Sequence, residues 1–273
     1  MTATEQIFSQ AIRLPQVPHI MQEVVSSLRN EDVSISQLAD LVSNDQVIAA
    51  KVLRLANSSY YGARRKVASI NEAVQLIGLN VFRNLVIASS LVGAFPKVEG
   101  FDLPAFWRSS MLVANLAHII GRDLDVDQGA LFSAGLMHGI GQLLIYLSFP
   151  ESAHELAEAS MGKSLKERRA LEQQHLGMDR FEVGMELARR WNFPETIQIA
   201  IGHYDEPADD ELPAQIVHAS LKIATGIQMG SSFSDMLDTL PPDLAERLGI
   251  DMDWFGEQGE VFDLLLDEAA SLS

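Results

Sequence analysis

The sequence predicts an all-α fold, built from many short helices with short connections. Capping residues recur at short intervals, the apolar residues between them follow the 3.6-residue helical period, and no segment alternates apolar and polar residues long enough to indicate a strand. Hydrophobic residues make up 47% of the 273 residues and charged residues 21%, which is typical of a well-packed globular protein. At this length we expect one large domain or two closely packed subdomains.

Helix starts and ends can be located along the chain. The expected starts are positions where a capping side chain precedes Glu or Gln by three residues: Ser34 with Gln37, Ser69 with Glu72, Ser164 with Glu167, and Asp179 with Glu182. The expected ends are glycines and prolines that follow helical patterns: Gly62, Gly78, Gly162, Gly177, Pro150 and Pro194. Apolar stripes at helical spacing lie between them, such as Leu38, Leu41 and Val42, then Val52, Leu53 and Ala56, then Val74, Ile77, Val81 and Leu85.

The run Ala56 to Gly62 joins two of these helices. Asn57 stands where the first helix should end, and Gly62 has the backbone freedom that a turn requires. Two adjacent tyrosines, Tyr60 and Tyr61, can bury their rings while their hydroxyls reach polar partners. We expect a structural cap that fixes one helix to the next, and a loop that contacts a ligand is the alternative.

The segment from Gln128 to Pro150 contains no charged residue and is long enough to cross a bilayer. It also contains four glycines, His138 and Gln142, and acidic rather than basic residues flank it. A helix that is apolar on all sides is expected at the centre of a large helical protein. We therefore interpret the segment as a buried helix and expect no membrane partner.

Two changes in composition suggest boundaries. The first lies between Gly93 and Asp102, and the second lies between Gly230 and Ser234, after which the chain becomes more acidic. The acidic extension, residues 229–273, ends in a predicted amphipathic helix from Glu257 to Ala270, with Val261, Leu264, Leu265 and Glu268 at helical spacing. Packing on the main body is the expected use of its apolar side, and a partner-binding or dimerising helix is the alternative.

Charge and cysteine content restrict the possible functions. A net charge of −17 disfavours nucleic acid as a partner, because the protein would repel phosphates. The short basic clusters Arg64-Arg65-Lys66, Arg168-Arg169 and Arg189-Arg190 are interpreted as solvated helix ends and faces. The absence of cysteine excludes disulfides and thiolate chemistry and fits the cytoplasm, and residues 1–10 show no secretory signal.

Several motifs occur in an order that resembles the HDOD domain. They are Leu14 to Pro18, Asp45 to Arg54, Ala56 to Gly62, Ser69 to Ala73 with Leu76 to Gly78, Phe106-Trp107, the His138 segment, Arg190 to Glu195 and Ile199 to His203. The resemblance covers residues 7–228, with an N-terminal helical subdomain at 7–95 and a degenerate HD-like subdomain at 101–228. It implies a fold similar to HD and HD-GYP phosphohydrolases, and a regulatory rather than catalytic role in bacteria.

The metal ligands of HD phosphohydrolases can be compared with this chain position by position. The His-Asp pair that names the superfamily falls on His138 and Gly139, and the lysine that follows it falls on Gln142. The other ligand positions fall on Ser109, Arg180, His203 with Tyr204, and Ser220. A catalytic zinc needs about three protein ligands, and only His138 and His203 remain. The resemblance therefore implies no metal, no cofactor and no catalytic residue.

The residues of this vestigial pocket still require an explanation. His138 is expected to be a buried neutral histidine with one hydrogen-bond partner, in preference to a metal ligand. Arg180 carries a permanent charge whose burial needs an anionic partner. The favoured partner is an internal carboxylate, Glu172 or Glu182, and the alternative is a bound phosphate or carboxylate.

The expected function is a non-catalytic module of bacterial signal transduction that acts through contacts with a separate signalling protein. Two alternatives remain. One is a divergent metal-dependent phosphohydrolase that acts on a nucleotide or cyclic dinucleotide. The other is a sensor whose vestigial pocket binds a small anionic ligand. No nucleotide-binding glycine motif or serine-hydrolase motif occurs in the chain.

Overall fold

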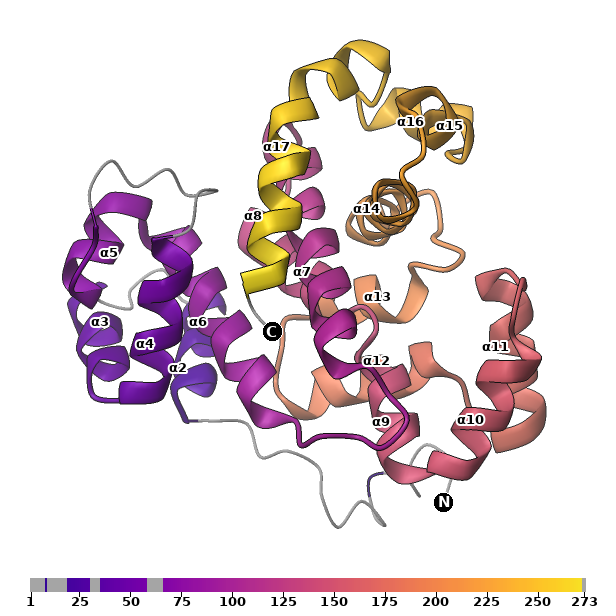
Figure 1. Cartoon of the computed structure of the whole chain (residues 1–273), viewed down its shortest axis with the longest axis horizontal. Helices are drawn as coiled ribbons and strands as arrows, with labels where there is room; N and C mark the ends of the chain where they lie inside the picture. The colour runs from indigo at the N-terminus through magenta and orange to yellow at the C-terminus, as the bar shows by residue number, and fades with distance from the viewer. Residues whose placement is uncertain (1–7, 9–18, 30–34, 58–65, 272–273) are drawn as a thin grey trace.

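The computed structural model describes residues 8, 19–29, 35–57 and 66–271 of the chain. Throughout these residues the regular elements are helices, and none of them forms a strand (Figure 1). The predicted all-α class is therefore confirmed. The expected helix start at Ser34, the turn at Gly62, the motif Leu14 to Pro18 and most of the cluster Arg64-Arg65-Lys66 lie outside the described residues.

The first helices form a small N-terminal bundle, drawn in indigo in Figure 1. Its elements are α2 (His19–Arg29), α3 (Ile35–Ser43), α4 (Gln46–Ala56), α5 (Ile70–Ile77) and α6 (Leu79–Ala94). Asp45 caps α4 by accepting the amide protons of Val47 and Ile48, each at 3.0 Å. Helix α6 contacts α2, α4 and α5 within the bundle and also α8 of the next part of the chain, so α6 joins the two.

Asn57 ends α4, as expected, and also holds the chain ten residues further on. Its Nδ2 donates to the carbonyl oxygens of Leu53 and Val67, at 2.7 and 2.9 Å. Its Oδ1 accepts the amide proton of Val67 at 2.8 Å. This one side chain satisfies a free carbonyl at the helix end and both backbone groups of Val67, which confirms the capping role expected of Asn57. Tyr60 and Tyr61 of the same predicted cap lie outside the described residues.

The apolar stripe from Val74 to Leu85 belongs to two helices rather than one. Gly78 separates α5 from α6 with φ 79° and ψ 163°, a conformation that favours glycine. The predicted starts at Ser69, Ser164 and Asp179 are confirmed, because each side chain accepts backbone N–H groups of the first turn. Ser164 and Glu167 form the full reciprocal capping box.

The second part of the chain surrounds α7 (Leu103–Ile120). Helix α7 has extensive contacts with α8 (Gln128–Met137), α14 (Leu212–Met229) and α17 (Met252–Ser271). A short 3-10 turn, η1 (Gly121–Asp123), leads from α7 towards α8. The remaining helices are α9 (Ile140–Ser148), α10 (Pro150–Ala159), α11 (Leu165–Leu176), α12 (Arg180–Arg190) and α13 (Glu195–His203).

The apolar segment after Gln128 lies in the core. In the part of the chain that the structure describes, Gln128–Ser148 is the one stretch long and apolar enough to cross a membrane. Of its 18-residue window with high hydropathy, 83% is buried inside the protein. The expectation of a single continuous helix is wrong, because His138 and Gly139 form a turn between α8 and α9. Gly139 has φ −89° and ψ 3°, which leaves the helical path.

The acidic extension contains α15 (Phe233–Asp238), α16 (Pro242–Arg247) and α17, which begins five residues before the predicted start at Glu257. In Figure 1 the yellow helix α17 runs beside α7. Phe255, Phe262 and Leu265 are buried on its inner side, and Phe255 stacks on Phe233 with ring centroids 5.5 Å apart. Helix α17 thus packs on the main body, as the favoured interpretation of its amphipathic pattern predicts.

Candidate functional site

The turn between α8 and α9 places His138 in the interior of the protein. The His138 Nδ1 atom lies 2.7 Å from the carbonyl oxygen of Gly135, and the residue is 8% exposed. Burial, opposed by the hydrogen bond to Gly135 and assisted by the nearby charge of Arg180, lowers the pKa of His138 to about 4. The imidazole is therefore neutral at pH 7, with its Nδ1 proton donated to Gly135 and its lone pair on Nε2.

The place of the missing acid beside His138 is occupied by an aromatic ring. A Cβ atom built on Gly139 would lie 2.8 Å from Cε2 of Phe106, which belongs to α7. Phe106 is itself held by aromatic neighbours, since its ring centroid is 4.9 Å from that of Trp107 and 5.4 Å from that of Phe101. A side chain at position 139 therefore requires this aromatic group to move.

Arg180, at the start of α12, forms a buried ion pair with Glu172 of α11. Its Nε donates to Glu172 Oε1 at 2.7 Å, its Nη2 donates to the same oxygen, and its backbone N–H donates to Oε2 at 2.9 Å. Its Nη1 donates to Oε1 of Gln142 at 3.1 Å. The side chains of Arg180 and Glu172 are only 11% and 4% exposed. Glu172 is one of the two internal partners expected from the sequence.

The charge of Arg180 is stabilised by these contacts. Burial by itself lowers the pKa of a guanidinium, but the attraction of Glu172 outweighs this, so the pKa of Arg180 is raised above its ordinary value. The guanidinium of Arg180 therefore keeps its positive charge at neutral pH. Gln142, which stands where HD enzymes have lysine, supplies a neutral acceptor rather than a second cation.

Two glycines bring α9 and α12 close enough for these contacts. A Cβ atom on Gly141 would lie 1.8 Å from the carbonyl oxygen of Arg180 and 2.8 Å from the amide nitrogen of Gly184. A Cβ atom on Gly184 would lie 3.4 Å from the amide nitrogen of Gly141, and 2.9 Å from Cγ2 of Ile201 on α13. The close crossing of the two backbones places Gln142 of α9 beside Arg180 of α12.

His203 and Tyr204, which occupy the last pair of positions in the HD pattern, lie in different environments. Tyr204 is buried, and its ring contacts His138 and Phe181 with centroid separations of 5.4 and 5.0 Å. Burial raises the pKa of the Tyr204 phenol above its ordinary value, so the hydroxyl stays neutral. His203 is 40% exposed, and its Nδ1 lies 2.5 Å from Oε1 of Glu211 at the start of α14. Tyr204, rather than His203, contacts His138.

Ser109 and Ser220, which occupy the remaining ligand positions of the HD pattern, belong to α7 and α14. Ser109 is half-buried on α7, three residues after Phe106. Ser220 is fully buried on α14, and its hydroxyl donates to the carbonyl oxygen of Ile216 in the same helix at 2.7 Å. The hydroxyl of Ser220 thus has a structural partner one turn away. Of the seven expected pocket residues, the structure brings His138, Gly139, Arg180 and Tyr204 together, and we call these four the His138 centre.

A second charged cluster next to this centre was not expected from the sequence. Arg169 of α11 donates from Nε to Asp179 Oδ2 at 2.9 Å, and from Nη1 to both carboxylate oxygens of Asp205 at 2.9 and 3.1 Å. Both carboxylates are fully buried, and the guanidinium lies 5.1 Å from the centroid of the Phe181 ring. The interpretation of Arg168-Arg169 as a solvated face is wrong for Arg169, because it holds α11 against the N-terminus of α12 and the C-terminus of α13.

His218 provides another contact that sequence reasoning missed. Its Nδ1 lies 2.8 Å from the carbonyl oxygen of Tyr204, and burial lowers its pKa below the ordinary value. As a donor to this carbonyl, the neutral ring of His218 holds α14 against the end of α13. The only signal in the sequence was a histidine on the apolar side of a helix, which does not identify its partner.

The residues of the His138 centre do not fit a divalent metal ion. Of the HD ligands that the resemblance implies, His138 remains, but position 139 has no side chain and the guanidinium of Arg180 would repel a cation. His203 pairs with Glu211 instead. Across residues 8, 19–29, 35–57 and 66–271, no group of three or more His, Cys, Asp or Glu side chains is placed to hold a metal.

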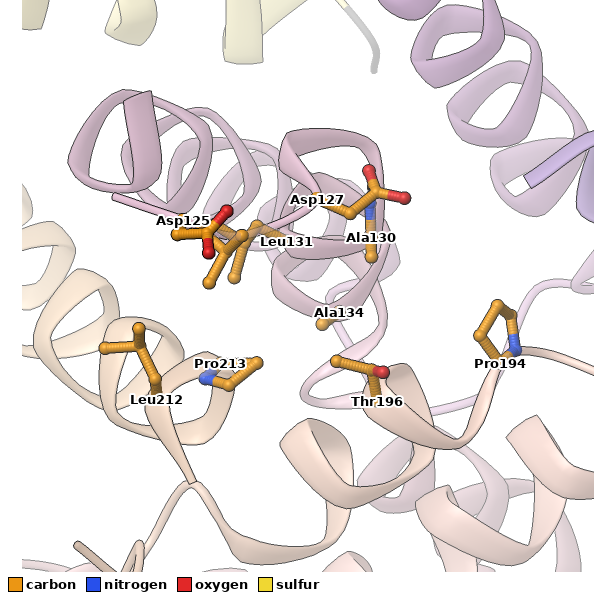
Figure 2. A pocket seen from close by; sticks show the side chains of 10 residues that line it. Asp125, Asp127, Ala130, Leu131, Ala134, Pro194, Thr196, Leu212 and Pro213 are labelled. Atoms are coloured by element: carbon orange, nitrogen blue, oxygen red, sulfur yellow. Dashed lines mark hydrogen bonds between the residues drawn. The ribbon is translucent and has the colours of Figure 1, made fainter. Parts of the chain in front are cut away.

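A separate cavity of about 630 Å³ lies at the other end of α8. Figure 2 shows Asp125, Asp127 and Leu131 on one side of it and Thr196, Leu212 and Pro213 on the other. Asp127 Oδ1 caps α8 by accepting the amide protons of Gly129 and Ala130, at 2.8 and 3.1 Å. The cavity carries no cationic lining residue and is distinct from the His138 centre, so it does not resemble a phosphate site.

Comparison with known proteins identifies related sequences. The family model of the HDOD domain matches residues 14–207, which is most of the chain and lies inside the 7–228 expected for the domain. A protein of Treponema pallidum (strain Nichols), called an uncharacterized protein, is 28% identical over 193 residues. That alignment covers 67% of this chain and 36% of the relative, so the chain spans about a third of the relative's length.

Solved structures share the fold over almost the whole chain. A Shewanella amazonensis SB2B protein, provisionally named a phosphohydrolase, superposes with a TM-score of 0.82 at 28% identity, covering 99% of this chain and 98% of that one. An HDOD domain protein of unknown function from Geobacter sulfurreducens gives a TM-score of 0.84 at 23% identity, covering 99% and 97%. A Marinobacter aquaeolei VT8 protein, provisionally named a signal transduction protein, gives 0.76 at 21% identity, covering 99% and 64%.

Proposed function

Since the chain belongs to the HDOD domain family, we propose that it is a non-catalytic regulatory module of signal transduction that acts by binding a separate signalling protein. Family membership supports a regulatory role, and the chemistry of the His138 centre supports the absence of catalysis. The net charge of −17 disfavours nucleic acid and anionic membranes as partners. We propose that the module works in the cytoplasm.

The observation that carries this proposal is the buried ion pair of Arg180 with Glu172. A hydrolytic metal site lowers the pKa of a bound water by placing a divalent cation beside it. In this chain a permanent monovalent cation stands in that region, already paired with a carboxylate and with Gln142. The guanidinium cannot lose its proton or bind water as a Lewis acid, so it cannot take over the water activation that a divalent metal supplies.

The rival hydrolase function is tested by assaying the full chain with manganese, iron, magnesium and zinc. The substrates are cyclic dinucleotides and bis(p-nitrophenyl) phosphate, and bound metal is measured by elemental analysis. We expect no turnover above the metal-only blank and no stoichiometric metal. Two variants complete the design: His138→Ala, and Met161→Ser at a position that is 77% exposed. Turnover that His138→Ala abolishes and Met161→Ser retains would show that the protein is an enzyme.

The protein-contact mechanism is tested by affinity capture from cells of the native host at two salt concentrations. We expect one or more specific signalling proteins to be retained, with affinity that falls as salt rises, because the protein is strongly acidic. A capture that retains no specific protein contradicts the mechanism. Tight binding of an anionic metabolite in that case supports a sensor function at the His138 centre, where the metabolite must compete with Glu172 for Arg180.

A further inference from the structure

A cavity of about 340 Å³ lies where the N-terminal bundle meets the second part of the chain. Helices α5 and α6 of the bundle line one side, and α7 and α8 line the other. The cavity is distinct from the His138 centre, with which it shares no residue. Its volume is at the lower end of the range for small-molecule sites.

Two polar side chains of this cavity, Asn84 and His118, each have one unused hydrogen-bond acceptor. Asn84 of α6 lines the cavity and is 3% exposed, and its Oδ1 has no hydrogen-bond partner among the described residues. His118 of α7 lines it as well, and its Nδ1 is buried and equally without a partner. An unsatisfied buried acceptor costs about 1–3 kcal/mol, so two of them at one cavity require an explanation.

The ionisation of His118 defines what its free nitrogen can do. Burial lowers the pKa of His118, which keeps the ring neutral at pH 7. The ring has a hydrogen bond with the backbone of Gln128, and since Nδ1 has no partner, Nε2 makes that bond as the donor. The Nδ1 atom is therefore a lone-pair acceptor. Asn84 Oδ1 and His118 Nδ1 are both acceptors, so they are complementary to a ligand that donates hydrogen bonds.

The rest of the lining limits the ligand further. Leu76, Ile77, Val81 and Phe132 supply apolar surface, and Asn115 supplies an amide that is 2% exposed. None of the residues that line the cavity is charged at pH 7. A charged ligand would lose its hydration without gaining a counter-ion, whereas a neutral ligand has no such penalty. Leu76 is 46% exposed, so apolar surface extends from the cavity to solvent.

We propose that this cavity binds a small, neutral, planar molecule that carries an amide or amino group, with its N–H groups donating to Asn84 Oδ1 and His118 Nδ1. Such a molecule satisfies both free acceptors and places its ring against Phe132 and the aliphatic residues. Because the bundle and the second part of the chain both line the cavity, the bound molecule contacts both. The proposal does not depend on the proposed regulatory function.

Titration of the full chain with benzamide, nicotinamide and adenine tests the proposal, with binding followed by calorimetry and ligand-observed NMR at pH 7.5. Benzoate and N,N-dimethylbenzamide are the matched comparators, the first because it is charged and the second because it has no N–H donor. We expect saturable binding of at least one N–H donor and binding at least about tenfold weaker for both comparators, since each lost hydrogen bond is worth about 1.4 kcal/mol.

Three variants assign the binding to this cavity. Asn84→Leu and His118→Phe each remove one acceptor and should weaken binding about tenfold. His118→Phe also removes the hydrogen bond to the backbone of Gln128, so thermal denaturation of each variant checks that it is folded. Ser89→Ala is the control, since Ser89 is also a buried residue of α6 with an unpartnered hydroxyl but does not line the cavity. Absence of saturable binding, equal binding of the comparators, or unchanged affinity in both acceptor variants would overturn the proposal.

Discussion

Arg180 and Glu172 are opposite charges that lie almost fully inside the protein, where each compensates for the lost hydration of the other. Breaking such a pair leaves an uncompensated charge, whereas removing both charges does not. We expect Arg180→Met and Glu172→Met each to lower the free energy of unfolding by about 3–5 kcal/mol. The double variant should lose less than the sum of the two, as measured by urea denaturation.

The exposed pair of Arg189 with Glu186 offers a control for that experiment, since the Arg189 side chain is 61% exposed. Arg189→Met should change the free energy of unfolding by less than about 1 kcal/mol. If Arg180→Met proves as mild as Arg189→Met, the interior pair contributes no more to stability than a surface pair, contrary to our interpretation.

Restoring the acid of the HD pair should not restore a metal site. Gly139→Asp places a side chain against Phe106, so we expect a loss of about 1–3 kcal/mol in stability and no gain in zinc or manganese binding. The double variant Gly139→Asp/Phe106→Ala removes the ring but leaves the Arg180 charge, and should also bind no metal. Calorimetric titration with each metal measures this, and a stoichiometric site in either variant would refute our view of the centre.

The neutral state of His138 predicts a pH dependence. The unfolded chain takes up this proton near pH 6.5, whereas the folded protein resists protonation until about pH 4. The stability contribution is therefore complete above pH 6.5 and is lost as the pH falls towards 4, to a total of about 3 kcal/mol. His138→Gln should flatten the stability curve in this window, as measured by denaturation at successive pH values. Parallel curves for the two proteins would contradict it.

Sequence reasoning predicted some of these residues and missed others, for physical reasons. Arg180 could be assigned an internal carboxylate because a buried guanidinium needs an anionic partner, and Glu172 was one of the two carboxylates expected. Arg169 could not be assigned in this way, because its partners Asp179 and Asp205 lie 10 and 36 residues away and only the fold brings them together. His203 was expected in the pocket, but a nearby carboxylate, Glu211, holds it at the surface.

At the scale of elements, helix ends followed from local chemistry and helix crossings did not. Ser69, Ser164 and Asp179 cap helices through side chains that act within a few residues, so their sequence pattern was sufficient. The crossing of α9 with α12 depends on Gly141 and Gly184, which lie 43 residues apart in the sequence but are in contact in the fold. The same limit applies to the turn at His138, which interrupts a continuous apolar pattern.

The glycine crossing predicts an ordered set of stabilities. Gly141→Ala directs a methyl group at the backbone of α12, which cannot yield, and should cost about 3 kcal/mol or more. Gly184→Ala meets a side-chain methyl of Ile201, which can turn, and should cost less. Gly256→Ala in α17 meets nothing within 4 Å and should stabilise the protein by up to about 1 kcal/mol. Thermal denaturation measures the series, and a Gly141→Ala protein as stable as the unaltered chain contradicts the close crossing.

At the scale of the whole molecule, the acidic extension and the main body share one core. Phe255 is fully buried, stacks on Phe233 of α15 and belongs to α17, which packs on α7. We expect Phe255→Ala to lower the free energy of unfolding by about 3–5 kcal/mol and to leave a single cooperative transition. Calorimetry measures both, and Met252→Ala, at a residue of α17 that is 48% exposed, should have little effect. A separate transition for the extension would show that it folds independently.

The Asn57 contacts also make one position in the chain suitable for protein engineering. Because Asn57 binds both backbone groups of Val67, the two ends of the intervening stretch are held together whatever lies between them. The entropic cost of lengthening a closed loop grows only with the logarithm of its length, so doubling it costs about 0.6 kcal/mol. A fluorescent reporter or an epitope tag could therefore be inserted after this asparagine without disturbing α4 or α5, giving a labelled protein in which binding can be followed directly.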